Sequence, residues 1–148
     1  MNDGLKVLGN LTVTLIDKNG NIKEEHNFKN LVVNTGLLYL THSLSNTSNG
    51  ATFNYIALGT GTSSPSAANT TLQVEIARQS VGAGAFDYNY WNVQTTFAAG
   101  TGTGTITEAG IFNATSGGTM LSRTTFTPIV KHASDSLTVS WTINFASA

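Results

Sequence analysis

The stretch Leu137-Thr138-Val139-Ser140-Trp141-Thr142-Ile143-Asn144-Phe145 decides the fold of this chain. Every second residue from Leu137 to Phe145 is apolar, and every residue between them is Thr, Ser or Asn. Successive side chains of a β-strand point to opposite faces of a sheet, so this alternation predicts a strand with one buried and one polar face. It is the clearest core strand in the sequence.

A second alternating segment lies near the other end of the chain. Within residues 5–17, Leu11, Val13 and Leu15 share one face. Asn19-Gly20 follows, and this dipeptide between alternating segments is the strongest short-range signal for a β-hairpin. We therefore predict a hairpin over residues 1–29. Eight of the chain's 15 charged residues lie in the first 30, so the outer face of this hairpin is expected to contact water.

One helix is expected, over residues 36–44. Thr35 stands before it as the expected N-cap, because a threonine hydroxyl there can accept a backbone N–H. Apolar side chains recur with helical spacing and predict a one-sided stripe. The stripe consists of Leu37, Leu38, Leu40, Thr41 and Leu44.

Short strands and turn signals fill the rest of the sequence. Residues 70–79 fit one helical turn that runs into a strand, and Pro128 is expected to end a strand over 120–126. Further strands are predicted over 53–58, 86–97 and 108–112. This spacing predicts an all-β fold, an antiparallel β-sandwich (jelly-roll or immunoglobulin-like) of about eight short strands with one short helix. The length fits a single domain over residues 1–148.

The composition is unusually poor in charge. Charged residues make up 10% of the chain, against about 25% in an average soluble domain. Thr, Ser, Asn and Gly together supply 66 of the 148 residues. The net charge of −1 argues against a nucleic-acid partner, and no apolar stretch is long enough to span a membrane. Such a surface suits contact with other proteins, although a neutral extracellular domain has the same composition.

Few residues suggest chemistry. The three histidines, His26, His42 and His132, have no metal-ligand spacing, and cysteine is absent. No nucleophile motif is found, so we expect no catalytic residues, no metal and no cofactor. We interpret Glu108 as a structural carboxylate that accepts hydrogen bonds from backbone N–H groups, from Arg78 or from Arg123.

Three neighbouring aromatic residues are the best binding candidates. Tyr88, Tyr90 and Trp91 offer contact area at low entropic cost and are typical of protein interfaces. The same rings suit stacking on sugar rings. Ordinary packing in the core is an equally weighted interpretation.

Three segments in a fixed order resemble a family of small bacteriophage virion structural proteins, which includes head-decoration and tail-fibre-associated proteins. The segments are Asn30–Leu37, then Ile56–Thr62 with Pro65, Thr71-Leu72 and Glu75–Arg78, and finally Thr107–Asn113, Gly117–Thr124 and Leu137–Ile143. The resemblance covers residues 30–145. It implies a part of the virion, assembled in the host cytoplasm, without catalytic residues to carry over.

The expected function is therefore that of a capsid decoration (cement) protein. Its partners would be the major capsid protein or other virion proteins, and repeated contacts would add up by multivalency. A homo-oligomer is expected. The alternatives are a tail or tail-fibre component, for which a trimer is expected, and a carbohydrate-binding module for host attachment.

Overall fold

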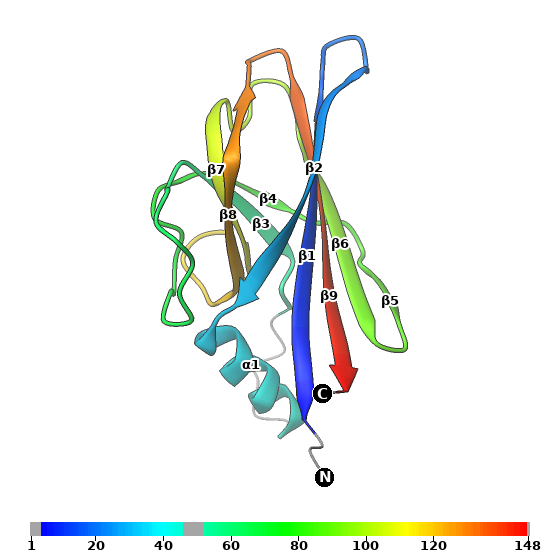
Figure 1. Cartoon of the computed structure of the whole chain (residues 1–148), viewed down its shortest axis with the longest axis vertical. Coiled ribbons are helices and arrows are strands. Elements are labelled where there is room, and N and C mark those ends of the chain that lie inside the picture. Colours follow the sequence, from blue (N-terminus) through cyan, green and yellow to red (C-terminus); the bar gives the residue numbers. More distant parts are fainter. Residues whose placement is uncertain (1–3, 46–51, 148) are drawn as a thin grey trace.

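The structure is a computed structural model that describes residues 4–45 and 52–147. Most of the described chain is in β-strands, with one short helix (Figure 1). The strands are β1 (Leu5–Ile16), β2 (Ile22–Val32), β3 (Tyr55–Gly59), β4 (Glu75–Ser80), β5 (Ala85–Asp87), β6 (Tyr90–Phe97), β7 (Gly104–Phe112), β8 (Met120–Lys131) and β9 (Ser136–Ser147), and the helix is α1 (Asn34–Leu44).

The strands of the described chain form one antiparallel sheet in the order β4-β3-β7-β8-β2-β1-β9-β6-β5. β2 joins its two halves, because Ile22–Asn30 pairs with β1 whereas Leu31 and Val32 pair with Arg123 and Ser122 of β8. The sheet curls into a half-barrel (Figure 1). The predicted all-β class, antiparallel pairing and single short helix are confirmed, but the sheet is not clearly closed into a sandwich.

The core lies on the inner face of the curled sheet. β9 pairs with β1 along the full length of both strands, with Trp141 opposite Leu11 and Val139 opposite Val13. All four of these side chains are fully buried. The alternation that predicted the last strand is confirmed, since the residues that face inward are the apolar ones.

The β1–β2 turn matches the predicted hairpin. The Asp17 carboxylate accepts hydrogen bonds from the backbone N–H groups of Asn19 and Asn21. Gly20 has a φ of 86°, a conformation that side chains other than glycine rarely adopt. This turn lies at one end of the half-barrel, while α1 lies at the opposite end (Figure 1).

The start and the orientation of the helix differ from the prediction. α1 begins at Asn34, and its N-cap is Val33 without a side-chain cap. The hydroxyl of Thr35 instead donates to the Met120 carbonyl at 3.0 Å, and this hydrogen bond anchors the helix on β8. Gly36 is the buried residue of α1 and lies against the backbone of Leu121, which explains the close approach.

Leu40 is the member of the predicted stripe that packs against the core, beside Tyr39. The side chains of Leu37, Leu38 and Leu44 are exposed. Gly36 lies four residues before Leu40, so the side of α1 that carries these two residues approaches β8, and the centre of the predicted stripe is turned away from the core.

Three strand predictions also need correction. No helical turn precedes β4, whose first residue is Glu75. The single strand predicted over 86–97 is a hairpin, β5 and β6, that turns at Tyr88 and Asn89. Pro128 does not end β8, because the β7–β8 register shifts there and the irregularity tolerates a residue that lacks an N–H.

Candidate functional site

Glu108 on β7 and Arg123 on β8 form a buried ion pair. The Oε2 atom of Glu108 lies 2.8 Å from Nη2 and 3.0 Å from Nε of Arg123. The two side chains are 0% and 1% exposed, respectively. β7 and β8 are neighbours in the sheet, with Glu108 opposite Thr125, so the register places both groups on one face.

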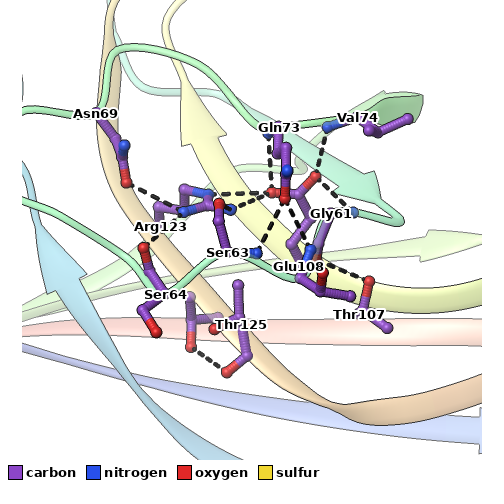
Figure 2. Close-up of polar contacts among 12 residues, drawn as sticks. Gly61, Ser63, Ser64, Asn69, Gln73, Val74, Thr107, Glu108, Arg123 and Thr125 are labelled. Atoms are coloured by element: carbon purple, nitrogen blue, oxygen red, sulfur yellow. Dashed lines mark hydrogen bonds and ion pairs between the residues drawn. The ribbon is translucent and has the colours of Figure 1, made fainter.

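The carboxylate of Glu108 also fixes the segment between β3 and β4 (Figure 2). Its Oε1 atom accepts the N–H groups of Gly61 at 3.0 Å and Val74 at 2.8 Å, and Oε2 accepts that of Gln73 at 3.0 Å. Burial opposes the charged form, but these backbone hydrogen bonds and Arg123 outweigh it and lower the pKa of Glu108. Glu108 is therefore held as a carboxylate.

Two glycines make room for this carboxylate. A Cβ atom on Gly59 or on Gly61 would lie 2.5 Å from Oε1 of Glu108. The Gly59-Thr60-Gly61 sequence is thus required by the close approach of a buried side chain. The hydroxyl of Thr107 donates to the Gly61 carbonyl at 2.8 Å and holds the same turn from the other side.

All five N–H groups of Arg123 have an acceptor. Besides Glu108, the guanidinium contacts Oδ1 of Asn69 at 3.1 Å, Oγ of Ser63 at 3.3 Å and the carbonyl of Ser64 at 3.5 Å (Figure 2). A guanidinium has five donors, so none is left to bind a substrate or an anion. We define the buried latch as Glu108 and Arg123 together with the residues that hydrogen-bond to their side chains, which are Gly61, Ser63, Ser64, Asn69, Gln73 and Val74.

Arg78 is not part of the buried latch. It pairs with Glu75 through two hydrogen bonds of 2.7 and 2.8 Å. It also donates to the carbonyls of Ala114 and Gly117, and its guanidinium lies 3.8 Å from the ring centre of Phe112. Arg78 therefore ties the edge strand β4 to the β7–β8 connection. Of the two arginines considered from the sequence, Arg123 is the partner of Glu108.

The three aromatic candidates lie in different environments. Tyr88, in the β5–β6 turn, is 101% exposed, whereas Tyr90 is 36% exposed and Trp91 is half-buried. Trp91 lies opposite the buried Ile143 and faces inward, so its neighbour Tyr90 faces outward. The three rings therefore share no single face.

Phe86 is an exposed aromatic residue that sequence reasoning missed. It is 82% exposed and lies directly opposite Trp91 across the β5–β6 pairing. The sequence contains one signal, the turn-favouring Asp87 and Asn89 around Tyr88, which would have separated a short edge strand from the strand that follows.

An apolar hollow of about 320 Å³ lies beside Trp91 at the α1 end. Its lining comes from the helix, from the segment just before β3 and from the inner face of β6, β8 and β9. The lining residues are Tyr39, Leu40, Ser43, Thr52, Phe53, Trp91, Leu121, Ile143 and Phe145.

A second ionic cluster lies at the opposite end of the half-barrel and was not predicted. The buried Nζ of Lys131 donates to the carbonyls of Ala98 and Asp135, and burial lowers its pKa. The Asp135 carboxylate accepts Lys23 Nζ at 2.9 Å and the His132 N–H at 3.0 Å. The hydrogen bond from Lys23 is the main cause of the lowered pKa of Asp135. The cluster joins the β1–β2 hairpin to the β8–β9 turn.

No family model, curated protein or solved structure matches this chain. The resemblance to phage virion proteins therefore stays a prediction from the sequence. Within residues 4–45 and 52–147, no three His, Cys, Asp or Glu side chains are grouped to hold a metal ion. In the same part of the chain, no helix has the length and apolar character needed to cross a membrane.

Proposed function

We propose that this protein is a structural component of a bacteriophage particle, a capsid decoration protein that binds the head shell through protein–protein contacts. The observation that carries the proposal is the contrast between the buried latch and the exposed aromatic residues. The two charged side chains of the latch, Glu108 and Arg123, are buried and paired with each other. The most exposed large side chains include Phe86 and Tyr88, which suit contact with another surface.

The latch supports a role in architecture. Gly61, Glu108 and Arg123 come from two of the segments that resemble virion proteins, and the structure joins them by hydrogen bonds. Residues in the segments that resemble virion proteins thus hold the β3–β4 connection against the sheet. On this proposal the chain has no enzymatic activity, and its partners are the major capsid protein or other virion proteins.

Density for the chain in purified phage particles tests the proposal. Cryo-electron microscopy of particles that carry the chain is expected to show it at regular positions on the head, in contact with several capsid subunits. Matched particles that lack the chain should release DNA at a lower temperature, and adding back the purified protein should restore the resistance. Equal resistance of the two kinds of particle would contradict a cementing role.

The same images distinguish the alternatives. Density along the tail, with threefold symmetry, would favour the tail or tail-fibre component. A carbohydrate-binding role has one observation in its favour, the exposure of Tyr88 and the partial exposure of Tyr90. A glycan-array signal that Tyr88→Ala abolishes would support that role. The finer fold type, a jelly-roll or immunoglobulin-like sandwich, stays part of this proposal.

A further inference from the structure

The β1–β2 turn contains a chemically reactive pair, Asn19-Gly20. In an Asn-Gly dipeptide the backbone nitrogen of the glycine can attack the side-chain amide carbon of the asparagine, because glycine has no side chain to obstruct the approach. Asn19 is exposed, and within the described part of the chain its side-chain amide has no hydrogen-bond partner. The carbon that would be attacked is therefore free to move.

The attacking nitrogen, that of Gly20, is held by the turn. Its N–H donates to the Asp17 carbonyl at 3.1 Å, and the Asp17 N–H donates to the Asn21 carbonyl at 2.9 Å. The Asp17 carboxylate holds the same turn by accepting the N–H groups of Asn19 at 2.8 Å and Asn21 at 2.9 Å. Attack requires the Gly20 N–H to leave its acceptor, lose its proton and turn toward the side chain of Asn19. The folded turn therefore opposes a reaction that its sequence favours.

We propose that Asn19 is a deamidation site whose rate is set by opening of the β1–β2 turn. Once the turn opens, Gly20 loses its amide proton and its nitrogen forms a bond with Cγ of Asn19. The bond between Cγ and the side-chain nitrogen breaks, and that nitrogen takes up a proton and leaves as ammonia. Water then opens the cyclic imide at either carbonyl, which gives aspartate or isoaspartate. The reaction needs water and no oxidant or reductant, and the inference does not depend on the virion role.

The isoaspartate product does not fit this turn. It carries the main chain through the side-chain Cγ and so lengthens the backbone by one methylene, whereas Ile16 pairs with Ile22 directly across the turn. Both products also add a negative charge beside the Asp17 carboxylate, which disfavours the charged forms of both groups. The same hairpin carries Lys23, which forms the ion pair with Asp135 of the β8–β9 turn. Deamidation is therefore expected to weaken the attachment of the hairpin to the rest of the fold.

Peptide mass spectrometry of the full chain, incubated at neutral pH, measures the rate of deamidation at Asn19. The same incubation in urea that unfolds the chain gives the rate without the turn, and we expect the folded chain to react at least about tenfold more slowly. Hydrogen exchange of the Gly20 amide begins with removal of the same proton from the same opened turn. Its protection factor should therefore match the ratio of the two deamidation rates within about threefold. The other Asn-Gly dipeptide, Asn49-Gly50, lies outside the described residues and is removed by Asn49→Gln in every protein compared.

Asp17→Ala separates control by the turn from the reactivity of the dipeptide. The substitution removes the acceptor of two backbone N–H groups and leaves Asn19 and Gly20 in place. The rate in the folded chain is expected to rise at least about threefold, while the rate in urea stays within about twofold of the parent. Asp87→Ala is the matched control, because the Asp87 carboxylate accepts the Tyr88 N–H in the β5–β6 turn, and it should leave the rate at Asn19 unchanged. Tryptophan fluorescence checks that both variants are folded, and the comparison with Gly20 exchange in the parent chain needs neither variant.

The isoaspartate form, isolated by chromatography, tests the consequence of the reaction. Its melting temperature is expected to lie below that of Asn19→Asp, which adds the charge without the methylene. Equal melting temperatures would overturn the proposed effect on the hairpin. A folded chain that deamidates as fast as the unfolded chain, or a Gly20 protection factor outside the threefold range, would overturn control by the turn. Absence of product at Asn19 in urea would overturn the site itself.

Discussion

Replacing Glu108 by glutamine tests whether the buried latch stabilises the fold. The substitution keeps the shape of the side chain and removes its charge. Five N–H donors point at the carboxylate: the backbone groups of Gly61, Gln73 and Val74, and two from Arg123. A glutamine offers one acceptor oxygen, and its amide nitrogen would face at least two of these donors whichever way it is turned.

The expected loss of stability follows from the burial of Arg123. Its side chain is 1% exposed, so in Glu108→Gln the guanidinium stays buried without a counter-charge. Removing one partner of a buried pair typically costs about 3–5 kcal/mol. Total stabilities of about 5–15 kcal/mol are usual for domains, so the variant should remain folded but be greatly weakened. For a chain of this size the melting temperature should fall by roughly 10–15 °C.

Urea unfolding followed by tryptophan fluorescence measures the loss in free energy. Glu25→Gln, the same chemical change at an exposed position of β2, is the matched control and should alter stability by less than about 0.5 kcal/mol. The double substitution Glu108→Gln/Arg123→Met should cost less than the two single losses added together, because it also removes the unpaired cation.

Hydrogen exchange locates the effect within the structure. The amide protons of Gly61, Gln73 and Val74 should exchange faster in Glu108→Gln, because their acceptor is weakened. Amides in β1 and β9 should follow only the global loss of stability. A loss below about 1 kcal/mol, or unchanged exchange at these three amides, would refute the structural role of the latch.

Three further predictions concern pH, helix packing and the exposed aromatic residues. The folded-state pKa values of Glu108 and Asp135 lie below their ordinary values of 4.5 and 3.8. Their stabilising contributions are therefore present above those ordinary values and are lost as the pH falls through the folded-state pKa values. The free energy of unfolding in urea, measured between pH 7 and pH 2, should show this decline, and it should fall less steeply with pH in Glu108→Gln. Gly36→Ala should destabilise the fold by about 1–3 kcal/mol although alanine favours helices, because the added Cβ would lie 2.4 Å from a backbone oxygen of β8. Thr41→Ala, at an exposed position of the same helix, is the control and should be neutral or stabilising in the same assay. Tyr88→Ala should change the melting temperature by less than about 2 °C, and a larger drop would show that this ring packs against the fold.

Local patterns in the sequence determined much of the strand structure. The alternation in Leu137–Phe145 and the Asn-Gly turn after β1 predict strands and a hairpin, because side-chain period and turn conformation depend on neighbouring residues. The low charge density also follows from composition alone. These properties fix the all-β class and the inward-facing residues of β1 and β9.

The tertiary structure decided which side chains meet. Arg78 and Arg123 were equal candidates for Glu108, and only the β7–β8 register selects Arg123. The helix shows the same limit, because the contact of Gly36 with β8 decides which leucines are covered. Leu40 packs against the core, whereas Leu37, Leu38 and Leu44 are exposed. Contacts such as that of Gly61 with Glu108 join residues 47 positions apart, and no local period carries information over that separation. Local sequence sets the direction in which a side chain points, and long-range pairing sets what it contacts.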